Sequence, residues 1–385
     1  MPEFVAITPF EMEGIAANEI KQFGFTDVRV QSGRVFFSCG YEEAFRANMW
    51  LRTAERILLH VGSFPATTFD QLFDGVFNLP WEDYLPVSAA FPVSGKCAKS
   101  QLMSVPDAQA ITKKAIAQRL LKKHKALVLP ESGAVFPISV HIHGNVAMLT
   151  IDTSGESLAR RGYRTYNGEA PLRETMAASL LSFGAWYTDQ PLCDPMCGTG
   201  TIAIEGAFMA LDRAPGLLRS FAMEKWQHIS AAAASAVREE AQDRFKRGVS
   251  CEIYASDIDP KAVALTKKHV IQAGISNQIK IRRATFDELD NLPERGAFVM
   301  NPPYGVRLMT AEETEKLYSD LGEWYKKYPY WNFNVITGNL QFERHFGKRA
   351  DRKRKMHNGK MECGVYIYRG QRRMNPDAQT GEKTV

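Results

Sequence analysis

The sequence DPMCGTGT (residues 194–201) joins a short apolar segment to the helix-like run TIAIEGAFMALD. Small residues at such a junction let the backbone approach a ligand, and free N–H groups at a helix start favour a negative group. The Gly-x-Gly core is weak evidence by itself, because many loops contain it. A nicotinamide site would have a third glycine, and a Walker loop would continue with Gly-Lys-Ser/Thr. Neither pattern is present, so we expect a different kind of ligand-binding loop.

Single apolar segments alternate with helix-like segments from about residue 170 onward, which predicts a parallel sheet covered on both faces. The expected strands are PLCDP, CEIYASDID, IKIRRAT, GAFVM, FNVITGN and CGVYIYR. The expected helices include APLRETMAASLLSFGAW, an amphipathic helix with Pro171 near its start, and DPKAVALTKKHVIQAGI. We interpret Arg213 to Gly248 as an insertion or an extended helical region.

An acidic residue ends the second of these strands, in ASDID (255–259). At that edge of a doubly wound sheet an acid typically accepts hydrogen bonds from ribose hydroxyls. Aspartate is also common as a helix N-cap, and Asp259 before Pro260 fits that role. Asp257 is therefore the better ribose candidate, and the pair of motifs suggests a nucleoside ligand.

The segment VMNPPYGVRL (299–308) ends the fourth strand with two prolines, which exclude a helix interior or a central strand. An exocyclic amine is a poor nucleophile because its lone pair is delocalised. The Asn301 side-chain oxygen and the Pro302 carbonyl could accept both N–H hydrogens and localise that lone pair, while Tyr304 stacks on the ring. The electrophile implied is a sulfonium methyl held in line by the neighbouring loop. The alternative, a plain strand-to-helix turn, is disfavoured by the two companion motifs.

The region before about residue 155 resembles small α+β units. Alternating runs around Gly144-Asn145 predict a hairpin. His141 and His143 lie two apart on one expected strand, but no further His or Cys pair has ligand spacing, so we expect no metal site. Cys193 and Cys197 lack a basic partner, which disfavours a cysteine-nucleophile mechanism.

The chain has 385 residues and a formal net charge of +5, which is mild for this length. Two or three domains are expected at that length. No apolar run is long enough for a membrane span, and the N-terminus lacks signal-peptide features, so we expect a cytoplasmic protein. Three clusters concentrate positive charge and suit a polyanion partner, although each alone could be a solvated face. They are KRADRKRK (348–355), RRGYR (160–164) and KKHK (122–125).

The motifs DPMCGTGT, ASDIDP and NPPYG together resemble the S-adenosylmethionine-dependent amino-methyltransferases. DTSGESLARRGYR, APLRETMAA and KRKMHNGKMECGVYIY narrow the likeness to THUMP-domain rRNA guanine-N2 methyltransferases. That family includes the N-terminal half of a bifunctional large-subunit rRNA enzyme and its stand-alone relatives. The resemblance covers nearly the whole chain. Because the chain ends where the bifunctional enzyme continues, a second methyltransferase activity is not expected.

The resemblance implies an α/β fold class, with a Rossmann-like class I methyltransferase domain after α+β ferredoxin-like and THUMP domains. The expected boundaries are 1–64 (ferredoxin-like), 65–155 (THUMP, RNA-binding), 156–375 (methyltransferase) and 376–385 (disordered tail). The implied function is methyl transfer from S-adenosyl-L-methionine to the N2 amine of a guanine in 23S rRNA, as part of rRNA processing. The implied partner is structured rRNA or a ribosomal subunit precursor.

The resemblance also assigns site residues by position. Asp194 and Gly198 would contact the methionine part of the cofactor, Asp257 its ribose, and Asn301, Pro302 and Tyr304 the target base. The full cofactor set is Asp194, Met196, Gly198, Thr199, Gly200, Asp257, Ile258, Asp287 and Asn301. One departure concerns the acid that often follows the third strand and meets the adenine amine. Thr285 occupies that place here, so Asp287 is the substitute we name.

The expected RNA contacts are cations on phosphates, from Arg160, Arg161, Arg164, Lys353 and Arg354, with Tyr163 and Tyr166 available for stacking. Alternatives remain open from the motifs alone. They are adenine-N6 methylation, a tRNA substrate, methylation of a protein glutamine amide, and an RNA-binding module that holds the cofactor without turnover. The motifs fix neither the modified nucleotide nor the oligomeric state.

Overall fold

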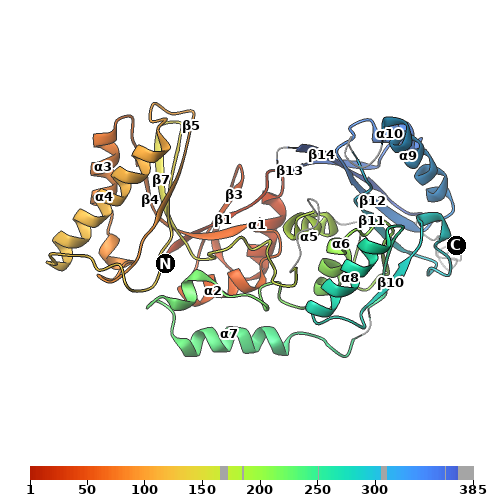
Figure 1. The fold of residues 1–385 in the computed structure, drawn as a ribbon, viewed down its shortest axis with the longest axis horizontal. Helices are drawn as coiled ribbons and strands as arrows, with labels where there is room; N and C mark the ends of the chain where they lie inside the picture. The colour runs from red at the N-terminus through yellow and green to blue at the C-terminus, as the bar shows by residue number, and fades with distance from the viewer. Residues whose placement is uncertain (165–171, 184–185, 250, 305–309, 360, 372–385) are drawn as a thin grey trace, which may run out of the picture. The chain divides into compact units, whose positions relative to one another are not determined.

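The computed structural model describes residues 1–164, 172–183, 186–249, 251–304, 310–359 and 361–371. They form two compact units (Figure 1), Met1–Arg161 with Ala214–Arg244, and Gly162–Arg213 with Phe245–Val385. Residues 214–244, which lie inside the expected methyltransferase domain (156–375), pack with the N-terminal unit, although the chain enters the second unit at Gly162. Among the described helices, none combines the length and hydropathy that a membrane crossing requires.

The first unit is built on a seven-stranded sheet in the order β2-β3-β1-β4-β7-β6-β5. The strands are β1 (Glu3–Ile7), β2 (Thr26–Gln31), β3 (Arg34–Ser38), β4 (Arg56–Pro65), β5 (Val93–Ala98), β6 (Ile138–His143) and β7 (Val146–Asp152). The predicted hairpin is confirmed, since β6 and β7 pair antiparallel around Gly144 and Asn145. Both turn residues have positive φ, 57° and 63°, as a tight two-residue hairpin turn requires.

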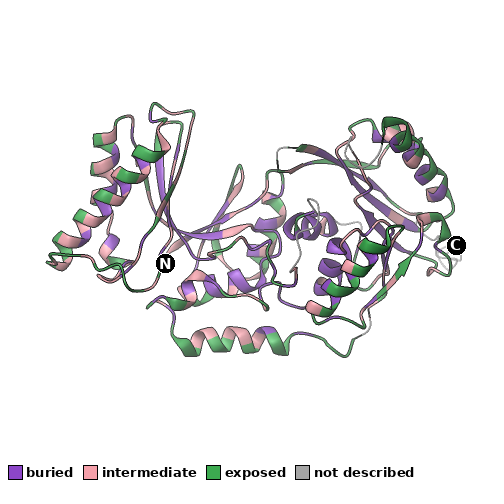
Figure 2. Cartoon of the chain, in the orientation of Figure 1, coloured by how far each residue is buried: buried purple, intermediate pink, exposed green. Residues whose placement is uncertain are grey.

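Helices cover one face of this sheet and share a single apolar core with it. They are α1 (Glu13–Gln22), α2 (Tyr41–Trp50), α3 (Phe69–Asn78) and α4 (Val105–His124), together with η1 (Trp81–Asp83), η2 (Ala222–Lys225) and α7 (Ala231–Asp243). Side-chain caps mark the first turn of several of these helices. At the start of α4, for example, the Ser104 hydroxyl accepts a hydrogen bond from the Asp107 N–H. Figure 2 shows that the buried residues concentrate in the strands and in the helix faces turned toward them.

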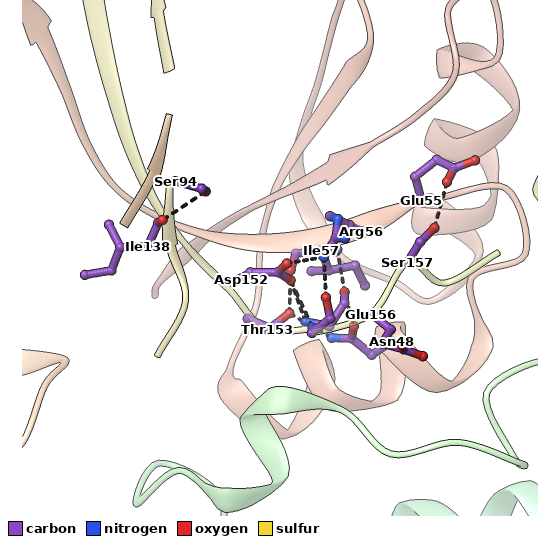
Figure 3. Close-up of polar contacts among 12 residues, drawn as sticks. Asn48, Glu55, Arg56, Ile57, Ser94, Ile138, Asp152, Thr153, Glu156 and Ser157 are labelled. Atoms are coloured by element: carbon purple, nitrogen blue, oxygen red, sulfur yellow. Dashed lines mark hydrogen bonds and ion pairs between the residues drawn. The ribbon is translucent and has the colours of Figure 1, made fainter. Parts of the chain in front are cut away.

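The segment DTSGES (152–157) ends β7 and is held by buried hydrogen bonds to the β4 side of the unit (Figure 3). The Thr153 hydroxyl donates to the Ile57 carbonyl at 2.6 Å and accepts from the Asn48 side-chain amide at 2.9 Å. The Ser157 hydroxyl donates to the Glu55 carboxylate at 2.8 Å. This part of the motif is therefore a structural tether within the first unit.

The second unit contains a seven-stranded sheet in the order β10-β9-β8-β11-β12-β14-β13. Its strands are β8 (Leu192–Asp194), β9 (Ile253–Asp257), β10 (Ile279–Arg283), β11 (Gly296–Met300), β12 (Trp331–Thr337), β13 (Arg352–Asn358) and β14 (Met361–Tyr368). The first five are parallel, and the β13–β14 hairpin is added antiparallel to β12. The order reverses between β8 and β11, which is where ligands bind in open α/β sheets.

Helices α6 (Thr201–Ala210) and α8 (Pro260–Gln272) lie on one side of this sheet, and α9 (Ala311–Lys326) and α10 (Phe342–Phe346) on the other (Figure 1). Helix α5 (Glu174–Ser182) differs from its predicted amphipathic character, because every residue from Glu174 to Leu181 is buried. A helix that is apolar or paired all round belongs to an interior. Pro171 lies outside the described residues.

Candidate cofactor and base site

Two strand ends meet at the switch point of the second sheet. Strands β8 and β11 pair in parallel, with Cys193 opposite Phe298. Their carboxyl ends therefore lie side by side, and the loops beginning at Pro195 and Asn301 leave the same edge of the sheet. This is the arrangement that the sequence predicted for DPMCGTGT and NPPYG.

Asp194, at the end of β8, is buried with 1% of its surface exposed. Its Oδ1 atom has no hydrogen-bond partner among the described residues. Burial raises the pKa of this carboxyl well above its usual range, and the nearby Asp257 raises it further, while the Met196 N–H lowers it. A buried carboxylate without a cation is costly, so the position suits a positively charged ligand group.

The loop after β8 depends on two glycines with positive φ, Gly198 at 53° and Gly200 at 84°. A Cβ on Gly198 would meet nothing within 4 Å, so open space adjoins the backbone there. A Cβ on Gly200 would lie 2.7 Å from Thr266 Cγ2, so this glycine is required for close packing. Both positions match a loop that lets a ligand approach its backbone.

Asp257, at the end of β9, holds the same loop. Its Oδ2 accepts from the Gly198 N–H at 2.9 Å, and its Oδ1 accepts from the Asp259 N–H at 2.9 Å. Each carboxylate oxygen has a second lone pair, which leaves acceptor capacity for a hydroxyl. The predicted helix cap is confirmed, because the Asp259 side chain accepts from the Lys261 N–H at the start of α8.

Two side chains of α8 bind the carbonyls of the loop, and the sequence analysis did not identify either. The Thr266 hydroxyl donates to the Gly198 carbonyl at 2.9 Å. His269 Nδ1 lies 3.0 Å from the Thr199 carbonyl, and burial lowers the pKa of this imidazole. The three-residue spacing places both on one face of α8. That spacing is the only sequence signal, and it is equally typical of a helix core.

Arg164 corrects one RNA-binding prediction. Its guanidinium donates to Glu174 Oε1 at 3.0 Å, to Thr199 Oγ1 at 3.0 Å and to Thr201 Oγ1 at 2.7 Å. Only 11% of its side chain is exposed. Its donors are directed into the glycine loop and α5, and so a direct phosphate contact is wrong for this residue.

The other residues of the RRGYR cluster include buried residues, which cannot contact RNA, and one exposed residue. Arg161 is 2% exposed and donates to the Leu158 and Arg52 carbonyls, which corrects its predicted role as a phosphate contact. Tyr163 is fully buried against Phe208, with ring centroids 5.9 Å apart, so it is unavailable for base stacking. Arg160 is exposed and pairs only loosely at the surface with Glu156, at 3.0 Å. Tyr166 lies outside the described residues.

The remaining cofactor candidates lie around the same edge. Met196 packs against the apolar core under the loop. Ile258 follows Asp257 with 64% of its surface exposed, an apolar side chain at the rim. Thr285 begins the short helix η3 (Phe286–Glu288), where its backbone N–H donates to the Glu288 carboxylate at 2.8 Å. Asp287 is exposed on that turn. Their contacts with a cofactor stay predictions.

Asn301 follows the last residue of β11. Its Oδ1 atom is buried and has no hydrogen-bond partner among the described residues. A buried amide oxygen left without a donor costs roughly 1–3 kcal/mol, so such groups mark places that a ligand completes. Pro302 beside it is also buried.

Tyr304 is held from the β13–β14 hairpin. Its hydroxyl lies 3.9 Å from Cys363 Sγ, and burial raises the pKa of this phenol to about 12 although a hydrogen bond with Asn358 opposes the shift. Gly338, after β12, lies against the ring: a Cβ there would be 3.0 Å from Tyr304 Cδ2 and 2.9 Å from Met361 Sδ. The sequence motif KRKMHNGKMECGVYIY thus supplies groups that fix the Tyr304 ring.

The other two RNA-binding candidates lie on β13, which the sequence analysis took for a basic run rather than a strand. Lys353 pairs with Glu343 and lies 5.5 Å from the centre of the Tyr366 ring. Arg354 is exposed. Their contact with RNA stays a prediction. Within the described residues, no group of three or more potential His, Cys, Asp or Glu metal ligands is found.

Three family models match the chain in succession. The RlmL ferredoxin-like domain matches residues 3–58, the THUMP domain residues 66–152, and the RMKL-like methyltransferase domain residues 161–367. The last alone covers more than half of the chain.

Curated relatives agree with these domains. The RNA methyltransferase candidate YpsC of Bacillus subtilis is 37% identical over 366 residues, 94% of this chain and 95% of the relative. The ribosomal RNA large subunit methyltransferase K/L of Shewanella baltica is 33% identical over 96% of this chain and 53% of the relative. The chain thus spans about half the length of the K/L enzymes that it matches.

Solved structures extend the likeness. A predicted N6-adenine-specific DNA methylase from Listeria monocytogenes is 41% identical with a TM-score of 0.91, over 96% of each chain. SMU.472, a methyltransferase candidate complexed with SAH (S-adenosylhomocysteine), is 37% identical with a TM-score of 0.92, over 96% of this chain and 98% of that one. Asp194 Oδ1, which has no hydrogen-bond partner among the described residues, and the open space beside the Gly198 backbone fit a ligand of that kind. The chain belongs to the RMKL-like methyltransferase family, with RlmL ferredoxin-like and THUMP domains, and its cofactor is S-adenosylmethionine.

Proposed function

We propose that the enzyme transfers a methyl group to the exocyclic N2 amine of a guanine in 23S rRNA. At the coarser level the chain is an S-adenosylmethionine-dependent RNA methyltransferase of the RlmK/L type. The choice of large-subunit rRNA is supported by the names of the K/L enzymes, which match 96% of this chain. The choice of guanine N2 follows from the resemblance of the sequence motifs to the guanine-N2 methyltransferases. The observation that carries the chemistry is the buried Asn301 Oδ1, which has no hydrogen-bond partner among the described residues and lies just beyond the end of β11, the strand beside β8.

In this proposal Asn301 Oδ1 and the Pro302 carbonyl accept the two hydrogens of the target amine. Two acceptors hold the nitrogen so that its lone pair points away from the ring, toward the cofactor side of the site. Tyr304 stacks on the base, and its phenol, with a pKa near 12, stays protonated at neutral pH. No side-chain base is needed, because the nitrogen becomes acidic once alkylated and its proton then passes to water.

Asp194, Gly198, Asp257 and Ile258 are the residues that would hold the cofactor. Bound S-adenosylmethionine supplies an electrophilic methyl group on a sulfonium. The Asp194 carboxylate compensates the positive charge of the ligand. Asp257 accepts hydrogen bonds from the ribose of the ligand, and the exposed Ile258 offers an apolar surface to its base. Orientation of the two reactants then accounts for much of the rate enhancement.

Adenine N6 is a second candidate, because an amine gripped by Asn301 and Pro302 is chemically equivalent in either base. The name of the Listeria monocytogenes structure, a predicted N6-adenine-specific DNA methylase, favours adenine as the base, although it names DNA and not RNA. The two bases differ in the ring carbon that carries the amine, which is C2 in guanine and C6 in adenine.

Transfer of labelled methyl groups to rRNA from a strain lacking the gene, followed by nucleoside mass spectrometry, tests the proposal. N2-methylguanosine from the 23S fraction is the expected product. N6-methyladenosine would favour the second candidate. A product confined to tRNA, label found only in protein, or no label at all would contradict the proposal. Asn301→Ala should remove the product while the variant still binds S-adenosylhomocysteine.

A further inference from the structure

The face of the first sheet opposite its helices forms a groove with a volume of about 390 Å³. Residues that alternate with the helix-packed positions line it, so it lies on the other side of the same strands. The lining residues come from strands β1, β2, β3, β4, β6 and β7. The ones used below are Glu3, Arg29, Arg34, Phe36, His60, His141 and Met148.

The sheet curls on the face that carries the groove. Arg34 lies on β3 and His141 on β6, with β1, β4 and β7 between them in the strand order. In a flat sheet four strand spacings would separate them by about 19 Å. The Arg34 guanidinium nevertheless contacts His141 Nδ1 directly. The two edges of this face therefore approach one another across a concave floor.

The floor of the groove is apolar, and Arg29 and Arg34 are the two arginines among its described lining residues. Phe36 and Met148 are 5% and 7% exposed and belong to a small core on this face. Arg29 pairs with Glu3 and lies 5.1 Å from the centre of the Phe36 ring. Glu3 is the one carboxylate among the described residues that line the groove, and it also pairs with His60, at 2.6 Å.

Arg34 differs from Arg29 in its partners. Its guanidinium contacts His141 Nδ1 and Met148 Sδ, and no carboxylate among the described residues pairs with it. Burial and the neighbouring cations lower the pKa of His141 to about 4, so this ring is neutral at physiological pH. Partial burial lowers the pKa of Arg34 as well. A half-buried arginine without a carboxylate partner gains a favourable interaction when a ligand supplies an anion.

We propose that this groove binds a single-stranded segment of the RNA substrate, with a backbone phosphate on Arg34 and a base on the guanidinium plane of Arg29, whose side chain is 56% exposed and covers the buried Phe36 ring. The inference rests on the proposed function for the nature of the partner. Guanidinium groups bind phosphate through two parallel hydrogen bonds, and proteins recognise single-stranded RNA by stacking unpaired bases on aromatic and guanidinium planes. The volume lies near the lower end of the range for small-ligand sites, and therefore fits about one nucleotide.

Arg34→Gln tests the groove, because glutamine keeps much of the side-chain length and removes the charge. Lys113→Gln is the matched control, since Lys113 lies on α4, on the helix-covered side, and pairs with Glu131 at the surface. We expect Arg34→Gln to bind a short labelled oligouridine about tenfold more weakly than the wild type and the control. The slope of log affinity against log salt should fall by about 1. Unchanged affinity and slope would overturn the inference.

The same variants separate this inference from the proposed function. If wild-type enzyme methylates rRNA, and Arg34→Gln does so with a raised KM for RNA, unchanged kcat and unchanged S-adenosylhomocysteine affinity, both stand. If wild type and Arg34→Gln methylate rRNA alike at limiting RNA, the groove inference fails and the function stands. If the wild type transfers no methyl group to RNA, the function fails. Preferential binding of an RNA duplex or an acidic peptide to the groove would overturn the inference whatever the transfer result.

Discussion

The two loops at the switch point differ in how their polar groups are used. In the loop after β8, Thr266 and His269 bind the backbone carbonyls, and Arg164 binds the Thr199 hydroxyl. In the loop after β11, the Asn301 amide oxygen has no partner among the described residues. The first loop is therefore held in place by side chains from other parts of the chain, whereas the second loop leaves the Asn301 oxygen available to a ligand.

This difference matches what each loop has to do. A cofactor cradle gains from rigidity, because a preorganised backbone loses little freedom when it binds. A group that grips a reacting amine must be free to accept hydrogens from the substrate and nothing else. Rigidity in the second loop is supplied instead at Tyr304, through Cys363 and the hairpin.

Asn301→Ala should have the largest effect, because it removes the available amide oxygen that distinguishes the second loop from the first. We expect the rate of methyl transfer to fall on the order of a hundred- to a thousand-fold, the usual cost of losing one oriented polar group at a reacting centre. Single-turnover transfer to rRNA measures it. Affinity for S-adenosylhomocysteine should be unchanged, and Asn277→Ala, on an exposed loop, should behave as wild type. Full transfer by Asn301→Ala would remove this residue from the mechanism.

Asp194→Asn should weaken cofactor binding about tenfold to a hundredfold, since a hydrogen bond to a charged group contributes roughly 1.5–3 kcal/mol. Calorimetric titration with S-adenosylmethionine measures the change. Asp290→Asn is the matched control, because that carboxyl is 70% exposed and pairs with Arg282. Equal affinities in all three proteins would contradict a role for Asp194 in the site.

Without cofactor the same variant should be more stable than wild type. The pKa of Asp194 is raised above its usual 3.8, so the folded state binds the proton more tightly than the unfolded state. Its contribution to stability is present below pH 3.8 and is lost as the pH rises through the folded-state pKa. The advantage of Asp194→Asn in Tm should therefore grow with pH toward neutrality. A constant difference across that range would contradict the burial argument.

Arg164→Lys tests whether the side chains that hold the loop after β8 contribute to cofactor binding. Lysine keeps the charge but loses the planar fork that joins Glu174, Thr199 and Thr201. We expect cofactor affinity to fall about tenfold, equivalent to roughly 1.4 kcal/mol, with RNA affinity unchanged. Arg160→Lys, at an exposed position of the same motif, should leave cofactor affinity intact. A loss of RNA affinity alone would restore the RNA-binding role first predicted for Arg164.

Gly338→Ala should have the smallest effect. The added Cβ would press on the Tyr304 ring at 3.0 Å and on Met361, which can give by a few tenths of an ångström. We expect kcat to fall a few-fold with cofactor affinity unchanged, because a small misplacement of the stacked base lowers the fraction of productive complexes. Gly14→Ala, where a Cβ meets nothing within 4 Å, is the control. Unchanged kcat would show that Tyr304 tolerates the shift.

Sequence periodicity identified the strands of the second sheet, because buried parallel strands appear as short apolar runs between helices. It did not identify β13, where burial is confined to the end of a strongly basic segment. Charge suggested solvent exposure for RRGYR, yet Arg161 is buried and Arg164 is largely covered, and both have partners far away in the chain. An arginine that contacts phosphate and one that holds a loop have the same local sequence signal.

The order of motifs along the chain determined by itself that a glycine-rich loop, an acid and Asn-Pro-Pro-Tyr follow successive strands. The reason is that each motif is local and depends on backbone conformation within a few residues. Only the tertiary structure decided that one side-chain oxygen of Asp194 and one of Asn301 have no partner among the described residues. It also decided that α8 binds the cofactor loop and that the first sheet curls so that Arg34 reaches His141. These properties depend on contacts between residues far apart in sequence, whose burial and hydrogen-bond partners no local pattern encodes.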